Sequence, residues 1–283
     1  MRLGRMRYVS CFVKRIFSPS AGMLSFLTAG VMLLFCLQGC GAPHDRDPGD
    51  KTWRAVFVID GDTIELAGGA RVRYIGIDTP ETRRRFGGEW VYDPEPYGPE
   101  ATNRNIELVM GEPLRLEFDR EKKDRYGRTL AYVFADDVMV NDLLIKEGLA
   151  TVYTFPPNTR YYPEFVSSQR EAIAGGRGIW SDLKSIGASD AAQYHGKFCR
   201  VKGKVSGHRL SRGRIYLYMH SEGPEYLRLV IFSRNLPLFR EQGIDPIEYY
   251  EGSFVEAIGK VDQGGTYAEM MIDNPFQMKV LDE

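Results

Sequence analysis

Short runs of alternating apolar and polar residues, separated by glycines, dominate the chain from residue 52 onward. Alternation with a period of two is typical of β-strands that bury one face, and glycine-containing turns join such strands into hairpins. Apolar residues that recur every three or four positions before a glycine indicate helices. We expect strands at Trp53–Ile59, Thr63–Leu66, Ala70–Ile77, Leu114–Phe118 and Thr129–Phe134, and helices at Glu100–Met110, Val140–Glu147 and Pro163–Ala174.

This order of elements predicts an α+β protein that is mainly β. Five short strands with three helices suit a small closed barrel such as the OB-fold. Strand patterns return from Lys197, where five more apolar runs and a helix near Leu236–Gln242 predict a second OB-like barrel. The expected divisions are a signal segment (1–40), a tether (41–51), the first barrel (52–181), a linker (182–196) and the second barrel (197–283).

Residues 1–40 have the pattern of an export signal. Five basic residues precede the uncharged run "SPSAGMLSFLTAGVMLLFCLQG", and the following Cys40 gives a resemblance to bacterial lipoprotein signals. That resemblance implies a lipid on Cys40 and a protein held in the cell envelope. An uncleaved single-span anchor and ordinary secretion are the alternatives, because the apolar run is nearly long enough to cross a bilayer. All three place the body of the protein outside the cytoplasm.

Composition changes this prediction little. The chain has 37 Lys and Arg against 38 Asp and Glu; removing the five basic residues of the signal leaves 32 against 38, a net charge of −6. Bulk charge therefore gives no support for general affinity to nucleic acid. Beyond Cys40 the only cysteine is Cys199, so the mature chain has no internal disulfide. Its four histidines are scattered without the spacing of a zinc site.

Two carboxylates fall at the ends of neighbouring predicted strands. Asp62 lies at the start of a strand just past a glycine turn, and Asp78 lies at the end of the next strand, in "RYIGIDTPET". Carboxylates that meet at one rim repel each other unless a proton or cation lies between them. Calcium takes carboxylate, carbonyl and water oxygens, and Pro80 favours an extended Thr79 whose carbonyl faces the same rim. The sequence therefore predicts a calcium site, although Asp60-Gly61 alone is explained by turn chemistry.

Arginines and a glutamate lie near the same predicted rim. Arg73 lies on the strand that leads to Asp78, and Arg128 follows the glycine turn of "DRYGR". Guanidinium groups bind phosphate oxygens in a bidentate manner and stabilise the extra charge of a pentacovalent phosphorus. Glu81, three residues after Asp78, is placed to orient or deprotonate a water. Taken singly, each arginine is more often an ordinary surface residue.

These motifs together resemble the staphylococcal nuclease (thermonuclease) family. The resemblance rests on "IDGDTIEL", "RYIGIDTPET", "YGPEA", "DRYGRTLAYVFADDVMVNDLLIKEGLA" and the final Trp of "GGRGIW", spanning about residues 53–180. It implies an OB-fold enzyme that hydrolyses DNA and RNA with Ca²⁺. It implies the metal ligands Asp62, Asp78 and Thr79, the neighbouring acidic residue Asp60, and the catalytic residues Arg73, Glu81 and Arg128.

The same resemblance suggests residues that hold the nucleotide: Arg125, Tyr126, Tyr153 and Phe155. Phe155 stands where the family commonly has tyrosine, which keeps stacking but removes a hydroxyl. Tyr153 and Phe155 are alternatively core aromatics. Arg83, Arg84 and Arg85 either gather substrate or form a solvated loop.

Three functions remain open at this point. The first is an exported calcium-dependent nuclease acting on nucleic acid, with a membrane contact through its N-terminus and no protein partner implied. The second is an inactive OB-fold scaffold or binding protein. The third is a separate nucleic-acid-binding role for the second barrel, where arginines accompany Tyr216 and Tyr218 at a spacing of two; ordinary exposed strand residues explain this equally well.

Overall fold

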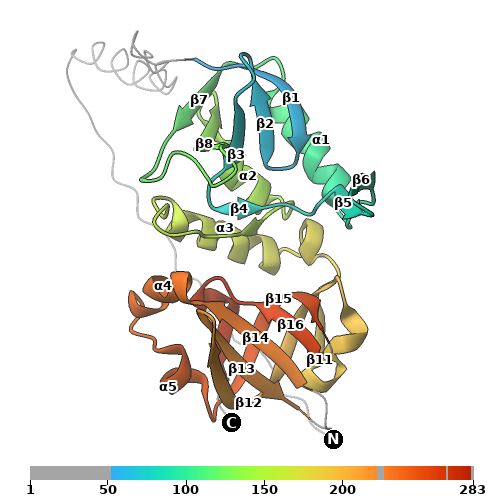
Figure 1. Ribbon diagram of the computed structural model, residues 1–283, viewed down its shortest axis with the longest axis vertical. Helices are drawn as coiled ribbons and strands as arrows, with labels where there is room; N and C mark the ends of the chain where they lie inside the picture. The colour runs from blue at the N-terminus through green and yellow to red at the C-terminus, as the bar shows by residue number, and fades with distance from the viewer. Residues whose placement is uncertain (1–51, 222–225, 266, 282–283) are drawn as a thin grey trace, which may run out of the picture. The chain divides into compact units, whose positions relative to one another are not determined.

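The first sheet closes into a barrel of five strands. The computed structural model describes residues 52–221, 226–265 and 267–281, so the expected signal segment and Cys40 lie outside the described residues. The strand order is β1-β2-β3-β8-β7, with β3 and β8 parallel (Figure 1). Trp53 and Leu114 exchange two backbone hydrogen bonds of 2.8 Å, which join the first strand region to the fourth. The strands are β1 Ala55–Asp60, β2 Thr63–Leu66, β3 Arg71–Tyr74, β7 Leu114–Glu117 and β8 Thr129–Ala135.

Three helices complete this barrel, as the sequence predicts. They are α1 Gly98–Val109, α2 Val140–Lys146 and α3 Tyr162–Ala174. The apolar positions of α2 face inward, since Leu144 and Ile145 are fully buried in the same core as Ile64 and Val72 of the sheet. Burying side chains of this size contributes about 1.5–3 kcal/mol each. The OB-fold prediction for this half of the chain is confirmed.

The expected strand Ala70–Ile77 is interrupted. β3 ends at Tyr74, Gly76 adopts a left-handed φ of 81°, and Ile77–Asp78 forms a separate strand, β4. β4 pairs with β10, Thr151–Val152, and leaves the barrel sheet. The apolar run continues through the break because Ile75 and Ile77 are both buried, which hid the turn in the sequence.

The expected irregular loop after Glu81 contains a hairpin. Strands β5, Arg83–Phe86, and β6, Glu89–Tyr92, pair around Gly87 and Gly88, which have φ values of 60° and 95°. Such left-handed angles are what a two-residue hairpin turn needs. All eight strand residues are exposed, so no alternation marked them as strands.

The second sheet repeats the strand order of the first. Its path β12-β13-β14-β16-β15 is closed by pairing of β12 with β15, and β14 runs parallel to β16 (Figure 1). The prediction of a second OB-like β-barrel therefore agrees with the pairing. The strands are β12 Phe198–Ser211, β13 Arg214–His220, β14 Tyr226–Phe232, β15 Phe254–Gly264 and β16 Tyr267–Met271.

Several shorter elements surround the second barrel. Residues 182–196, expected to be a linker, instead form β11, Lys184–Gly187, which pairs in parallel with β12, and the 3₁₀ helix Ala188–Tyr194. The expected helix near Leu236–Gln242 is α4, Leu236–Arg240. Two further elements, the helix α5, Pro246–Tyr250, and the edge strand β17, Met278–Val280, were not predicted from the sequence.

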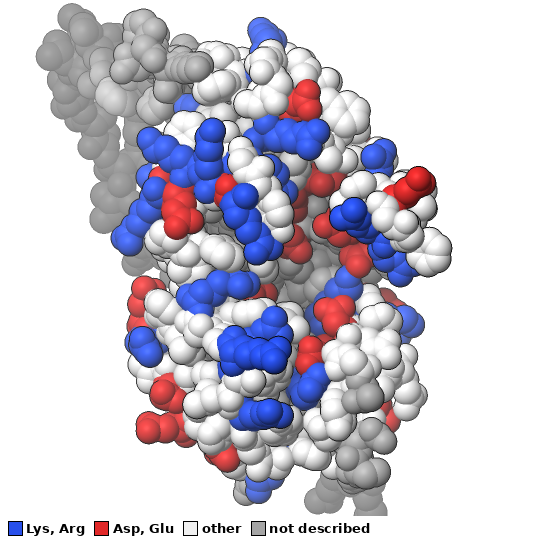
Figure 2. Space-filling view, viewed as in Figure 1, with Lys and Arg blue, Asp and Glu red and all other residues white. Residues whose placement is uncertain are grey.

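Direct contacts join the two barrels. The rings of Trp180 and Phe198 lie 5.1 Å apart, Tyr162 and Phe276 lie 6.2 Å apart, and Lys260 forms an ion pair with Glu95. Both barrels carry Lys, Arg, Asp and Glu on the face seen in Figure 2. Within the described ranges, no helix has the length and apolarity needed to cross a membrane.

Candidate active site

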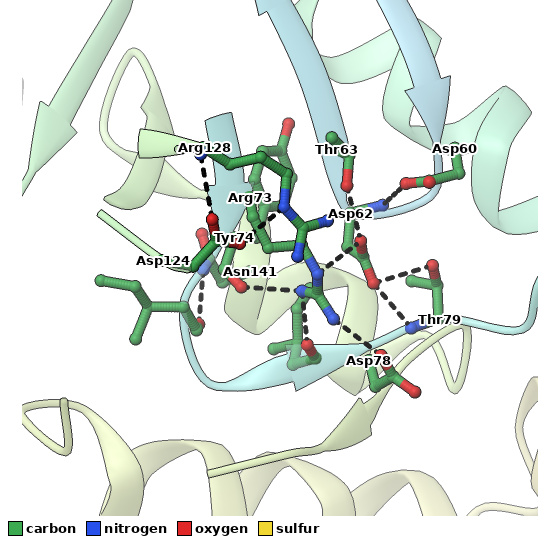
Figure 3. A network of polar contacts seen from close by, with 12 residues as sticks. Asp60, Asp62, Thr63, Arg73, Tyr74, Asp78, Thr79, Asp124, Arg128 and Asn141 are labelled. Atoms are coloured by element: carbon green, nitrogen blue, oxygen red, sulfur yellow. Dashed lines mark hydrogen bonds and ion pairs between the residues drawn. The ribbon is translucent and has the colours of Figure 1, made fainter. Parts of the chain in front are cut away.

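Arg73, on β3, lies between two carboxylates. Its Nε is 3.1 Å from Asp62 Oδ1, and its Nη2 donates to Asp78 Oδ1 at 2.7 Å (Figure 3). Its Nη1 donates to the backbone carbonyls of Tyr74 and Ile77 at 2.8 and 2.7 Å. The side chain is only 13% exposed, so these four contacts fix the guanidinium. The structure thus joins three residues that the sequence placed at one rim.

Asp62 also holds Thr79. Its Oδ2 accepts the Thr79 amide at 2.9 Å and the Thr79 hydroxyl at 3.1 Å, while Oδ1 accepts the Thr63 hydroxyl at 3.1 Å. The structure therefore brings together Asp62, Asp78 and Thr79, which were predicted as metal ligands.

Two glycines hold the segment from Asp78 to Glu81 in place. A Cβ on Gly61 would lie 2.7 Å from Thr79 Oγ1, and a Cβ on Gly98 would lie 2.8 Å from the Glu81 carbonyl oxygen. Real Cβ atoms do not approach other atoms so closely, so only glycine fits at either position. The turn before β2 and the start of α1 therefore pack directly against the segment that carries Thr79 and Glu81.

The carboxylates raise one another's pKa. Burial and then the charge of Asp62 raise the pKa of Asp60, whose Oδ1 accepts the Asp62 amide at 3.1 Å. Partial loss of water around Asp78, whose side chain is still 51% exposed, raises its pKa; Arg73 opposes the rise, and Asp62 and Glu81 add to it. Partial burial and the charges of Asp60 and Asp62 raise the pKa of Glu81 to about 6. A cation placed here would favour the ionised forms.

The donor chemistry suits a hard cation. In the described part of the chain, no group of three His, Cys, Asp or Glu side chains is arranged so that it could hold a metal ion by itself. Calcium sites nevertheless complete their coordination with backbone carbonyls and water. Asp62 and Asp78 supply two carboxylates, and the Asp78 side chain remains 51% exposed, so solvent reaches it. The oxygen ligands present fit Ca²⁺ better than a softer metal such as zinc.

A pocket of about 450 Å³ opens beside Arg73. It contains every residue predicted to hold nucleotide, together with Arg73 and Arg128, the two arginines predicted to be catalytic. Tyr126 is 68% exposed and Phe155 49% exposed, so neither is a core aromatic. Asp62, Asp78 and Glu81 do not line this pocket, so Arg73 is shared between the pocket and the carboxylate cluster. The walls include Arg73, Arg125, Tyr126, Arg128, Tyr153, Phe155 and Arg234.

Asp124 fixes Arg128, which the sequence analysis did not anticipate. Arg128 Nε donates to Asp124 Oδ2 at 2.7 Å, and Oδ1 accepts the backbone amides of Tyr126 and Arg128 at 2.9 and 3.0 Å (Figure 3). Burial alone would raise the pKa of Asp124, but these hydrogen bonds lower it below its usual range. Asp124 therefore stays ionised and orients the guanidinium.

Asn105 was also missed. It is fully buried on α1, where its Nδ2 donates to the Asp60 carbonyl at 3.0 Å and its Oδ1 accepts the Tyr74 hydroxyl at 2.8 Å. It thereby ties the turn before β2 to the end of β3. A polar residue on the buried face of a helix is the signal that marks it, since such groups are buried only with partners.

Arg234 belongs to the second barrel but lines the pocket of the first. Its Nη2 donates to the Tyr153 hydroxyl at 3.3 Å, and its Cζ lies 4.6 Å from the centre of the Phe155 ring. No local pattern links it to residues some 80 positions earlier.

Comparison with known proteins agrees with this geometry. The family model described as "Staphylococcal nuclease homologue" matches residues 71–182. A "Thermonuclease" of Staphylococcus intermedius is 38% identical over 167 residues, which cover 57% of this chain and 96% of the relative. The chain belongs to the staphylococcal nuclease family. "Endonuclease YncB" of Bacillus subtilis (strain 168) is 41% identical over 151 residues, covering 51% of this chain and 69% of the relative.

The family match covers most of the predicted site residues but only part of the chain. "SPbeta prophage-derived endonuclease YokF" of Bacillus subtilis (strain 168) is 44% identical over 128 residues, or 44% of this chain and 42% of the relative. The family match begins at Arg71 and ends at residue 182, whereas Asp62 precedes it and Arg234 follows it. The structure connects both residues to the matched region through Arg73 and Tyr153.

Proposed function

We propose that the chain is an exported calcium-dependent nuclease that hydrolyses phosphodiester bonds of DNA and RNA by attack of water. The observation that carries this proposal is the position of Arg73. It contacts Asp62 and Asp78 on one side and lines the pocket with Arg128 on the other. A phosphate bound there meets two guanidinium groups next to a carboxylate cluster.

Asp62, Asp78 and Thr79 would hold the calcium ion. When bound, the ion supplies positive charge beside the phosphate and offsets the repulsion among the carboxylates. Asp60 accepts the Asp62 amide, so it positions the turn that carries Asp62. Arg73 keeps the two ligands paired by its own charge.

Glu81 is the residue that acts on water in this proposal. Its side chain is exposed to solvent, and its pKa of about 6 lies close to neutral pH. Bound calcium would favour the ionised form of Glu81, which is the form that can orient water or accept its proton. Its backbone rests against Gly98, which fixes its position relative to Thr79.

Arg73 and Arg128 act on the phosphate. Charge-assisted hydrogen bonds from guanidinium groups strengthen as negative charge accumulates on the phosphoryl oxygens. Asp124 holds Arg128 through its Nε, so the Nη groups are the ones available to the substrate. The arginine at this position also suits the departing oxygen, which leaves with a negative charge.

The remaining pocket residues suit a nucleotide. Arg125 lies beside the Tyr126 ring and donates to its hydroxyl at 2.6 Å, which combines a phosphate-binding cation with a stacking surface. Tyr153 and Phe155 offer two more rings on the opposite element. Stacking of a base on an aromatic ring contributes about 1–3 kcal/mol without selecting its sequence. Such a pocket favours neither DNA nor RNA.

Export is part of the proposal because of residues 1–40. Their basic start and apolar run suit transfer across the cytoplasmic membrane, and Cys40 suits attachment of a lipid that keeps the enzyme in the cell envelope. Secretion or a single-span anchor are the alternatives. Mass spectrometry of the purified membrane-bound protein would distinguish a lipid on Cys40 from an intact N-terminus.

One experiment separates this proposal from an inactive binding protein. Cleavage of labelled DNA and RNA is measured with calcium and with a chelator. We expect calcium-dependent cleavage of both, a fall of about 10²–10³-fold in kcat for Arg128→Ala, and a fall of about 10²–10⁴-fold for Glu81→Gln. Arg240→Ala, on the exposed surface of α4, is the matched control and should cut at the parent rate.

Two results would reject the nuclease proposal or its roles. Binding of both polymers without cleavage in calcium would favour the inactive scaffold. Cleavage by Arg128→Ala at the parent rate would remove that residue from catalysis.

A further inference from the structure

The second barrel carries a concentrated group of cations on an otherwise acidic chain. A hollow of about 360 Å³ lies on the outer side of β12, β13 and β14, and no Asp or Glu lines it. Lys and Arg side chains lie over these strands in Figure 2. We name this surface the arginine–tyrosine face; it consists of Arg209, Ser211, Arg212, Arg214, Tyr216, Tyr218 and Arg228.

The register of the strands places these side chains next to one another. Along β13, Ile215, Leu217 and Met219 are buried, so the alternate residues point outward. Arg209 on β12 is directly opposite Tyr216, and Arg228 on β14 is directly opposite Tyr218. Each tyrosine therefore has a guanidinium as its neighbour across the sheet.

The hairpin between β12 and β13 adds a further arginine. Arg212 and Gly213 form its two-residue turn with φ values of 50° and 73°. Asn or Gly is favoured at the first of these positions, because a longer side chain in the left-handed conformation costs energy. An arginine kept at this position extends the positive charge beyond the ends of the strands.

Arg228 is held in place at the centre of the face. Its guanidinium lies 4.9 Å from the Tyr267 ring centre and 5.7 Å from that of Tyr216, donates to the Gly264 carbonyl at 2.6 Å, and pairs with Glu269. Its Nε is buried without a hydrogen-bond partner among the described residues.

A row of rings borders the same face. Tyr226 stacks on Tyr267 with ring centres 4.8 Å apart and an interplanar angle of 24°, and it meets Tyr218 edge-on at 5.5 Å. Aromatic side chains with guanidinium neighbours are the groups that bind unpaired bases and their phosphates.

Phe232 connects this face with the nuclease pocket. The guanidinium of Arg214 lies 4.7 Å from its ring centre, and that of Arg234 lies 4.2 Å from it. Arg234 in turn contacts Phe155 and Tyr153, which line the pocket. A continuous series of arginine–ring contacts therefore leads from the second barrel to the active site.

We propose that the arginine–tyrosine face binds single-stranded nucleic acid and guides the strand over Phe232 and Arg234 into the pocket. Rings bind only bases that are unpaired and accessible, so a duplex would leave the tyrosines unused. Guanidinium groups contact the phosphates without reading sequence. The inference rests on the proposed function for the strand's destination, but binding at this face needs no cleavage.

The test measures binding in the absence of cleavage. The full chain carrying Glu81→Gln is titrated, in chelator, onto a fluorescent single-stranded oligonucleotide of about 20 nucleotides, long enough to extend beyond one OB-fold site. Arg209→Glu/Arg214→Glu is compared with Arg240→Glu/Lys279→Glu. The second pair makes the same change of charge on exposed residues outside the face.

We expect the first pair to weaken binding at least tenfold and the control pair to change it less than twofold. Loss of two phosphate contacts should also make the slope of log K against log salt shallower by about 1.4. Arg209→Gln/Arg214→Gln, which removes charge without reversing it, should give an intermediate loss. Equal thermal melting of all variants checks that they are folded.

Three outcomes would overturn the inference. The first is equal binding by the face and control variants. The second is tighter binding of duplex than of single strands. The third is a face variant that loses binding only to anionic lipid vesicles and still binds single strands. A chain that binds through this face but does not cut in calcium rejects the proposed function and leaves the inference standing. If the chain cuts in calcium but the face variant binds as well as the parent, the inference is rejected and the proposed function stands.

Discussion

The two barrels share one strand order but carry opposite chemistry. In each barrel the third strand runs parallel to the fifth, and pairing between the first and fourth strand regions closes the barrel. The turn after the first strand holds Asp62 in the first barrel and Arg212 in the second. Topology therefore fixes where side chains meet, while their identity decides whether a cation or a phosphate is attracted.

The third strand of each barrel carries an arginine that meets acidic residues. Arg73 on β3 is paired with two carboxylates, whereas Arg228 on β14 is paired with one, that of Glu269, among the residues that the structure describes. An arginine between two acids adds little net charge and mainly orders its partners. The face around Arg228 keeps a net positive charge, because Arg209, Arg212 and Arg214 surround it. The first arrangement suits chemistry on a phosphate and the second suits binding of a strand.

The largest expected effect tests whether the barrels also share one folding transition. Phe165→Ala in the first core and Phe239→Ala in the second remove fully buried rings. Each should lower the free energy of unfolding by about 3–5 kcal/mol. Because Leu238 packs into the first core and Trp180 packs against Phe198, both variants should shift the same calorimetric transition.

Leu210→Ala is the control for these core variants, since Leu210 is 63% exposed and its truncation should cost less than about 0.5 kcal/mol. Two separate transitions, each moved by only one of the core variants, would show that the barrels fold independently.

A smaller effect compares two aspartates beside arginines. Burial raises the pKa of Asp273 to about 6 despite the charge of Arg234, whereas Arg128 and two amides lower the pKa of Asp124. Asp273 binds its proton more tightly in the folded chain, so stability falls as pH rises from about 4 to about 6. Asp273→Asn should therefore be more stable than the parent at pH 7.5, by about 1–3 kcal/mol, and similar to it at pH 4.

Asp124→Asn should behave in the opposite way. Its stabilising contribution is present above the usual aspartate pKa and is lost as pH falls, so this variant should be less stable than the parent at pH 7.5. Urea unfolding at both pH values measures the two differences. If both variants changed the free energy of unfolding in the same direction at pH 7.5, the predicted contrast between Asp273 and Asp124 would be wrong.

The smallest expected effect concerns the first hairpin of the second barrel. Arg212→Asn places a residue that tolerates a φ of 50° in the turn of the second barrel and should raise the free energy of unfolding by about 0.5 kcal/mol. Urea denaturation measures this gain. A loss of stability would mean that the Arg212 side chain itself supports the fold.

The sequence predicted the elements whose two faces differ. The bounds of β2 agree with the expected Thr63–Leu66, where the buried Ile64 and Leu66 lie on either side of the less buried Glu65. The convergence of Asp62 and Asp78 was predictable for a related reason, since each follows or ends an apolar run. Strands β5 and β6 were not predictable in this way, because neither face is buried.

The supporting residues of the site were harder to predict. Asp124 was part of a recognised motif, but its role depends on a bend that brings it back onto Arg128. Arg234 enters the pocket only because the second barrel contacts the first, and periodicity within one segment carries no information on contacts between segments. Local pattern thus predicts which residues share a strand, and family resemblance adds which strands share a site.

Gly98 extends the site to a residue with no side chain. It begins α1, and a Cβ there would collide with the Glu81 and Pro80 carbonyl oxygens at 2.8 and 3.0 Å. A single extra carbon would therefore displace Glu81, the residue proposed to act on water, by pushing on its own backbone. A larger residue at position 98 would fit only if the entry to α1 were reshaped first.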